Sequence, residues 1–217
     1  GIIAGGGELP EAVAASVHAE GRGVFVLAVR GLTGAWADAY PHEWMSLGEV
    51  GRAFKAFSGA GVDRIVMAGR VDRPNFSDLK LDMRGALLLP RIVGAARKGD
   101  DALLRIMVEI FADEGFAAVG VADAAPGLVA GDGPLGHLTP NPGQQADMEA
   151  GFGMVAALGA LDVGQAAVVC EGLPLVMAAA EGTDAMIARI ATLRPALRGT
   201  AQKRRGVLVK ALKSTQD

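Results

Sequence analysis

The chain has 217 residues, a formal net charge of −3 and a hydrophobic content of 51%. This charge provides no general positive field to hold a polyanion, so nucleic acid is not expected as a partner. The sequence has no run of about 18 apolar residues, and no membrane-spanning helix is predicted. The length allows either one large domain or two domains of about 100 residues each.

The first part of the chain alternates apolar runs of strand length with helical segments. Strands are predicted at residues 1–4, 24–29, 64–68 and 116–121. Helices are predicted at residues 11–20 and 50–60, and as two segments between 82 and 114. Strands separated by helices are typical of parallel βαβ units. We therefore predict an α/β protein with a Rossmann-like, parallel-sheet N-terminal domain at residues 1–125.

Residues 126–142 are rich in glycine and proline and are predicted to be a linker. A smaller α/β C-terminal domain is predicted at residues 143–217. Its predicted helices are residues 144–161 and a segment from Thr183 or Asp184 to Leu193, and its predicted strands are residues 166–170, 174–180 and 206–210. The one cysteine, Cys170, lies in an apolar run typical of a buried strand, which fits a reducing cytoplasm.

The run of residues 5–10, Gly-Gly-Gly-Glu-Leu-Pro, connects the first predicted strand to a helix. Glycines at such a turn let backbone N–H groups approach a phosphate, and the helix N-terminus adds partial positive charge. The dinucleotide-binding fingerprint is matched only in part, because Pro10 stands where a third glycine would be. Arg30, after the second strand, could accept a ribose phosphate, so an NADP cofactor is one alternative. A tight turn without a ligand is another.

A charged loop, residues 69–74, follows the predicted strand at residues 64–68. Ligands of open parallel sheets bind beyond the carboxyl ends of the strands, so this loop and the glycine turn are expected to line one crevice. Arg70 or Arg73 could then contact a phosphate. An exposed loop with local ion pairs is the alternative.

Two further segments, residues 181–184 and 210–217, each follow a predicted strand. Carboxylates close to phosphate suit Mg²⁺, and lysines neutralise the charge that develops in phosphoryl transfer. Helix capping by Thr183 or Asp184 is the alternative. Residues 86–93 form a helical apolar patch, for which core packing is the default interpretation and acyl-chain binding the alternative.

Four segments taken together resemble one family: GIIAGGGELP at residues 1–10, KGDDALLR at 98–105, AEGTDAM at 180–186 and GVLVK at 206–210. In this combination the chain resembles the UDP-2,3-diacylglucosamine pyrophosphatases of the LpxI type along essentially its whole length. The EGTDAM element and the VLVK strand are the most specific part of the resemblance.

The resemblance implies a Mg²⁺-dependent hydrolase of lipid A biosynthesis. Its substrate would be UDP-2,3-diacylglucosamine and its products UMP and 2,3-diacylglucosamine 1-phosphate. It also implies a second domain that continues beyond Asp217. We expect a cytoplasmic protein with a peripheral contact to the inner membrane, because the substrate is membrane-derived, and a homodimer. An NADP-dependent oxidoreductase and a non-enzymatic nucleotide- or lipid-binding module remain the alternatives.

The resemblance also suggests a role for individual residues. The expected metal ligands are Asp217, Asp184 and Glu181, and the expected catalytic residues are Asp217, Asp184 and Lys210. The expected substrate contacts are Gly5, Gly6, Gly7, Glu8, Leu9, Pro10, Arg70, Thr183 and Lys213.

Overall fold

The computed structural model describes residues 1–72 and 74–212. The chain divides after Gly133 into an N-terminal unit, Gly1–Gly133, and a C-terminal unit, Pro134–Asp217. This division lies inside the segment 126–142 that the sequence predicts to be a linker. Each unit has its own sheet and its own hydrophobic clusters.

The N-terminal unit is built on a five-stranded parallel sheet with the order β3-β2-β1-β4-β5. Its strands are β1 Ile2–Ala4, β2 Val26–Val29, β3 His42–Met45, β4 Arg64–Ala68 and β5 Ala117–Ala118. The first strand of the chain pairs with β2 on one side and β4 on the other, so the strand order reverses between β1 and β4. The predicted Rossmann-like sheet is confirmed.

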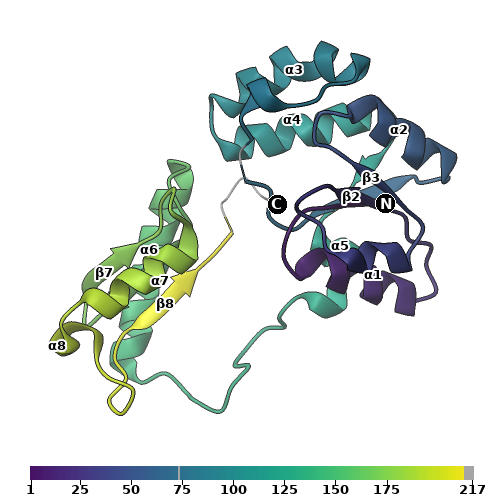
Figure 1. Ribbon diagram of the computed structural model, residues 1–217. Helices are drawn as coiled ribbons and strands as arrows, with labels where there is room; N and C mark the ends of the chain where they lie inside the picture. Colours follow the sequence, from purple (N-terminus) through teal and green to yellow (C-terminus); the bar gives the residue numbers. More distant parts are fainter. Residues whose placement is uncertain (73, 213–217) are drawn as a thin grey trace. The chain divides into compact units, whose positions relative to one another are not determined.

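Helices cover both faces of this sheet (Figure 1). On one face lie α1 Leu9–Ala19 and α5 Val121–Ala124, and on the other lie α2 Val50–Gly59, α3 Met83–Ala96 and α4 Asp100–Asp113. Alternate residues of a strand point to opposite faces. The side chains of Ile2 and Ala4 accordingly pack in the hydrophobic cluster beneath α1. The side chain of Ile3 packs against the hydrophobic cluster beneath α2 and α4.

The cluster beneath α2 and α4 contains several aromatic rings. Phe54, Phe57, Phe111 and Phe116 pack edge to face, stacked or tilted, with ring centroids 5.2–6.3 Å apart. Burial of each large side chain contributes roughly 1.5–3 kcal/mol, so these rings account for much of the attachment of the two helices. Short 3-10 helices complete the unit at Ala35–Ala39, Phe76–Asp78 and Pro126–Leu128.

The structure corrects the sequence prediction at two edge strands. No strand was predicted at His42–Met45, yet β3 pairs with β2 there; its polar residues and partial burial hide the strand pattern. The strand predicted at residues 116–121 is wrong beyond Ala118. Only two residues pair with β4, and the chain turns at Gly120 into the short helix α5.

The C-terminal unit has a three-stranded antiparallel sheet with the order β7-β6-β8. Its strands are β6 Ala166–Cys170, β7 Leu173–Met177 and β8 Val207–Lys210, and its helices are α6 Pro142–Ala160, α7 Gly182–Thr192 and α8 Pro195–Arg198. Val155 of α6 packs on the face that carries Ala167 and Val209. Met186 of α7 packs on the opposite face. The predicted smaller α/β domain is confirmed.

Details of this unit also differ from the prediction. Strand β7 ends at Met177 rather than at residue 180. Thr183 and Asp184 do not cap α7: the N-cap is Glu181, and no side chain bonds the free amides there. Cys170 is buried in β6 as predicted, and burial raises the pKa of its thiol. Among the described residues, no helix combines the length and apolar character needed to cross a membrane.

Candidate active site

The glycine turn and the loop after β4 lie side by side at the carboxyl edge of the parallel sheet. Gly5 N–H donates to the carbonyl of Ala68 at 2.8 Å. Gly6 and Arg70 then exchange two backbone hydrogen bonds, each of 2.8 Å. This edge is where the strand order reverses, the usual position of a ligand crevice in such sheets.

The close approach of these two loops requires glycine at two positions. A Cβ atom on Gly5 would lie 2.7 Å from the Arg70 carbonyl oxygen. A Cβ atom on Gly69, whose φ is +90°, would lie 2.7 Å from both Gly6 O and Pro10 Cγ. Close packing of the two loops is therefore sufficient to explain why glycine occupies both positions.

The next residues leave backbone N–H groups open to a ligand. Gly7 has a φ of +90° with no heavy atom within 4 Å of an added Cβ, and Gly7, Glu8 and Leu9 are all exposed. Glu8 is the N-cap of α1 but forms no side-chain cap, and Pro10 occupies the first turn. Uncapped amides at a helix N-terminus favour an anion such as phosphate.

Side chains of the loop after β2 support the carboxyl end of the parallel sheet. The Thr33 hydroxyl donates to the Ala4 carbonyl at 2.5 Å and accepts from Val29 N–H at 2.8 Å, which ties the ends of β1 and β2 together. Arg30 donates through Nη2 to the Trp44 carbonyl at 3.2 Å. The Arg70 guanidinium is 80% exposed and forms an ion pair with Asp72 at 3.3 Å, so its side chain extends into solvent beside the glycine turn.

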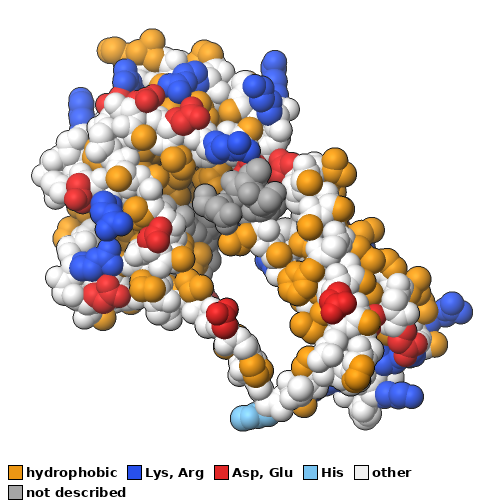
Figure 2. All heavy atoms as spheres, turned by 180° about the vertical axis from the view of Figure 1, so that it is seen from behind, with side chains coloured by type: hydrophobic (Ala, Val, Ile, Leu, Met, Phe, Trp, Pro, Cys, Tyr) orange, Lys and Arg blue, Asp and Glu red, His pale blue; other side chains and the backbone are white. Residues whose placement is uncertain are grey.

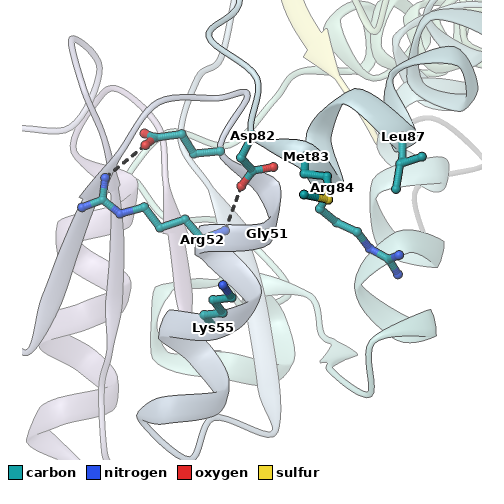
Figure 3. A pocket seen from close by; sticks show the side chains of 8 residues that line it. Gly51, Arg52, Lys55, Asp82, Met83, Arg84 and Leu87 are labelled. Carbon is teal, nitrogen blue, oxygen red and sulfur yellow. Dashed lines mark hydrogen bonds and ion pairs between the residues drawn. The ribbon is translucent and has the colours of Figure 1, made fainter.

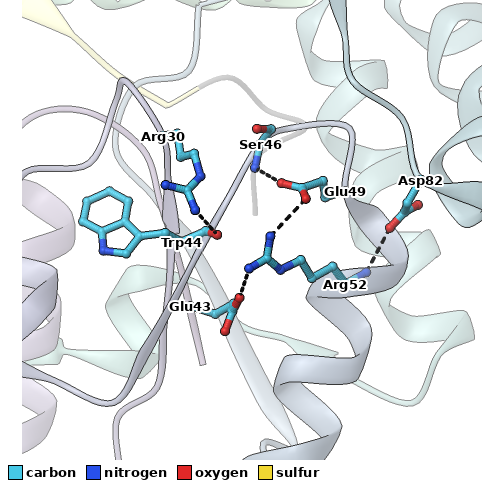
Figure 4. Close-up of polar contacts among 7 residues, drawn as sticks. All are labelled: Arg30, Glu43, Trp44, Ser46, Glu49, Arg52 and Asp82. Atoms are coloured by element: carbon cyan, nitrogen blue, oxygen red, sulfur yellow. Dashed lines mark hydrogen bonds and ion pairs between the residues drawn. The ribbon is translucent and has the colours of Figure 1, made fainter.

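A charged network joins the β3 loop to α2 and α3 (Figure 4). Arg52 pairs with Glu43 and, at 3.1 Å, with Glu49. Ser46 N–H donates to Glu49 at 2.6 Å. That hydrogen bond is the main cause that lowers the pKa of Glu49, and Arg52 lowers it further against the opposing effect of burial. Asp82 accepts from Arg52 N–H at 3.0 Å, so the network fixes the start of α3.

Beside this network, α2 and α3 border an open groove of about 580 Å³. Apolar side chains of α3 and cationic side chains of both helices line it (Figure 3). Its lining residues are Glu49, Gly51, Arg52, Lys55, Asp82, Met83, Arg84 and Leu87. The groove is distinct from the glycine turn, although both lie toward the carboxyl ends of the strands.

In the C-terminal unit, two of the predicted segments lie at the same end of the antiparallel sheet. Ala167 of β6 is in register with Met177 at the end of β7 and with Val209 near the end of β8. The chain after β7, which carries Thr183, and the exposed Lys210 at the end of β8 therefore leave the sheet at the same end. The Thr183 segment and Lys210 thus lie at the same end of the sheet, on either side of β6.

Glu181 and Asp184, the two acids near this end of the sheet, differ in their surroundings. Glu181 forms an ion pair with Arg189 at 2.8 Å. Asp184 is exposed in the first turn of α7, and within the described residues its carboxylate contacts no cation. Asp184 is thus the carboxylate that is free to meet a ligand.

Comparison with known proteins covers both units. A family profile described as the LpxI N-terminal domain matches residues 1–128, and one described as the LpxI C-terminal domain matches residues 131–217. The chain belongs to the LpxI family. It is also 44% identical over 217 residues to the UDP-2,3-diacylglucosamine pyrophosphatase LpxI of Caulobacter vibrioides, a match that spans 100% of this chain and 78% of the relative.

For this LpxI family member, the predicted site residues fall into three groups. The structure brings residues 5–10 together with Arg70 at the edge of the parallel sheet. It brings Lys210 and the segment 181–184 to the same end of the antiparallel sheet, on either side of β6. The predicted residues Lys213 and Asp217, like Arg73, lie outside the described residues.

A magnesium site can be tested against the residues that the structure describes. These residues contain no group of three or more histidine, cysteine or acidic side chains arranged to hold a metal ion. Mg²⁺, however, commonly takes only one or two carboxylates and completes its shell with water and substrate phosphate. The exposed Asp184 fits that requirement better than Glu181, which is already paired with Arg189.

Sequence reasoning missed two residues that support the loops of the two sheets. Thr33 carries no motif, and only its position shortly after a strand end could have indicated a bracing role. Asp147 of α6 is 4% exposed and accepts hydrogen bonds from Glu171 and Gly172 N–H at 2.8 and 2.7 Å. The helix also carries the exposed Glu149, so no local sequence pattern singles out Asp147 as the buried acid.

Proposed function

We propose that this chain hydrolyses the pyrophosphate bond of UDP-2,3-diacylglucosamine, releasing UMP and 2,3-diacylglucosamine 1-phosphate for lipid A biosynthesis. The observation that carries this proposal is the LpxI family match across both units, joined to 44% identity with a relative named for this activity. The glycine turn at the strand-order reversal supports it independently, because it suits a phosphate-bearing ligand.

In the N-terminal unit, residues 5–10 hold the nucleotide. The amides of Gly7, Glu8 and Leu9 are exposed and lack a side-chain cap, so they can donate to phosphate oxygens. The guanidinium of Arg70, 80% exposed beside the turn, adds a positive charge. The ordered backbone contacts between Gly6 and Arg70 keep these donors in place before the ligand arrives, which reduces the entropy lost on binding.

In the C-terminal unit, Asp184 and Lys210 act on the reacting phosphate. A bound Mg²⁺ would polarise the phosphoryl oxygens and lower the pKa of a coordinated water. Asp184 would hold this ion, with Asp217 as a second ligand and Glu181 as a weaker candidate. Lys210 and Lys213 neutralise charge on the phosphoryl group, and the Thr183 hydroxyl donates to a phosphate oxygen.

The alternatives receive no support from these findings. An NADP-dependent oxidoreductase was suggested by the glycine turn and Arg30, and neither the LpxI profiles nor the name of the relative supports it. A binding module without activity does not agree with the name of the relative. A cytoplasmic location, a homodimer and a peripheral contact with the inner membrane are further parts of the proposal, the last because the substrate carries acyl chains.

The proposal is tested by incubating the purified protein with UDP-2,3-diacylglucosamine and Mg²⁺ and measuring UMP by chromatography. UMP should appear, stop when EDTA removes the metal and return when Mg²⁺ is restored. Asp184→Asn should lower kcat by at least about tenfold, the scale of a lost catalytic group, whereas Asp132→Asn, an exposed acid elsewhere, should not. Release of UDP instead of UMP would show a different bond being broken.

A further inference from the structure

Helix α3 is unusual because it is largely apolar but mostly not buried. Arg84 and Arg91 are its only charged residues. A helix of this kind normally lies inside a protein. In α3, however, only Gly85 and Ala96 are buried, while Met83 is 84% and Leu87 is 67% exposed.

The helical spacing separates two apolar faces. Leu88 and Ile92 pack against the cluster beneath α2 and α4. The opposite face, at spacings of three and four residues, is exposed. We call it the α3 stripe, and its residues are Met83, Leu87, Pro90 and Gly94. The helix lies at the top of its unit in Figure 1, and the top of that unit in Figure 2 carries hydrophobic side chains together with both basic and acidic ones.

The stripe is flanked mainly by positive charge. The segment 79–98 contains the single acid Asp82, whose carboxylate already accepts from the N–H groups of Gly85 and Arg52. The cations of this segment are Lys80, Arg84, Arg91, Arg97 and Lys98.

The cations differ in how far they are already paired. Arg84 and Arg91 pair with acids of the α4 region, yet their side chains remain 49% and 47% exposed. For Lys80, Arg97 and Lys98, the structure of residues 1–72 and 74–212 gives no acidic partner. Lys80, Arg97 and Lys98 therefore remain available to an anionic surface, whereas Arg84 and Arg91 are largely neutralised by their acidic partners.

We propose that α3 rests on the anionic surface of a phospholipid membrane, with Met83 and Leu87 among the acyl chains and the flanking cations at the headgroups. A surface that joins apolar side chains to lysine and arginine suits this partner. A two-fold contact between two copies would instead set the same cations against each other. Charge thus favours the membrane over a second copy.

The position of the stripe agrees with this partner. Asp82 N–H donates to the Gly48 carbonyl at 3.2 Å, so α3 starts at the loop after β3, at the carboxyl edge of the sheet. The groove bordered by α2 and α3 also reaches Met83 and Leu87. In this respect the inference rests on the proposed function, because an acylated substrate would approach that edge from the membrane.

Sedimentation with phosphatidylcholine vesicles, with and without phosphatidylglycerol, tests the inference. The protein should sediment with the anionic vesicles only. Met83→Ser with Leu87→Gln should weaken binding at least about tenfold, through lost apolar burial. The control Leu161→Gln removes a leucine that is 74% exposed in the C-terminal unit and should change binding less than about twofold.

A second pair of variants isolates the charge. Arg97→Glu with Lys98→Glu should weaken binding to the anionic vesicles by at least about tenfold. Lys203→Glu with Arg204→Glu changes the net charge equally at exposed positions of the C-terminal unit and should have a much smaller effect. Added salt should weaken the binding of the wild type.

Equal vesicle binding by all variants, or none by the wild type, would overturn the inference. So would a dimer in light scattering that the Met83→Ser and Leu87→Gln changes dissociate, since a second copy would then cover the stripe. UMP release from detergent-dispersed substrate separates the two proposals: the variant Arg97→Glu with Lys98→Glu should retain it. If the wild type binds vesicles but releases no UMP, the proposed activity fails and the membrane surface stands.

Discussion

Gly5 occupies a position at which the backbone of one loop touches that of another. The Arg70 carbonyl oxygen would lie 2.7 Å from a Cβ at this position, and backbone cannot yield as a flexible side chain could. Because Gly6 and Arg70 also exchange two hydrogen bonds, a shift of the turn would disturb the amides of the next residues. The glycine therefore supports both stability and the binding of phosphate.

Gly5→Ala should lower the free energy of unfolding by about 1–3 kcal/mol, as overpacking does, and weaken UMP binding. Urea denaturation and calorimetry measure the two effects. Gly59→Ala is the matched control, because no heavy atom lies within 4 Å of a Cβ there and alanine is the better helix former. Equal stability of the Gly5 variant and the wild type would contradict the close approach of the two loops.

Asp147 plays a comparable supporting role in the C-terminal unit. Its carboxylate holds the β6–β7 turn, in which Glu171 and Gly172 both have positive φ values, 52° and 75°. Asp147→Ala should therefore cost about 1–3 kcal/mol of unfolding free energy. The exposed acid two residues later provides the control, and Glu149→Gln should change stability by less than about 0.5 kcal/mol. An unchanged urea midpoint for Asp147→Ala would show that water replaces the carboxylate.

At the level of elements, the loop between β3 and α2 is set by the Glu49 carboxylate. Its pKa lies below that of the unfolded chain, chiefly because Ser46 N–H donates to it. The native state therefore binds fewer protons at this site. Its stabilising effect is present above the unfolded pKa of glutamate, about 4.3, and is lost as the pH falls through the folded pKa.

Glu49→Gln should consequently lower the Tm at pH 7 and have a smaller effect in acid, below the folded pKa. Thermal unfolding monitored by circular dichroism at both values of pH measures this. The exposed Glu149→Gln serves again as the charge-matched control. An equal loss of Tm at both values of pH would mean that Glu49 acts by packing and not through its charge.

Buried elements were predictable from sequence, and edge elements were less so. Strand β6 is buried at every position, and its apolar run predicted its bounds correctly. Strand β3, with His42 and Glu43, is an edge strand whose partial burial leaves no apolar run. The predicted start of α7 was wrong for a different reason: the helix begins at Gly182, whose φ is +80°, and its N-cap Glu181 forms no side-chain cap.

At the scale of the whole chain, the candidate site could be predicted only where a motif meets a strand end. Residues 5–10 and Arg70 follow neighbouring parallel strands, so their proximity follows from topology. The contacts that depend on tertiary packing, such as Thr33 with Ala4 and Arg52 with Asp82, leave no local pattern. The exposed face of α3 could not be predicted either, because a largely apolar helical sequence is normally interpreted as a buried helix.

The central claim is that this LpxI family member breaks the pyrophosphate bond by attack of water. The most direct measurement is a reaction with UDP-2,3-diacylglucosamine and Mg²⁺ in ¹⁸O-labelled water, with mass spectrometry of both products. UMP and 2,3-diacylglucosamine 1-phosphate should form, with the label in the phosphate of one of them. Label in neither product, or no UMP from the folded wild-type protein, would contradict it.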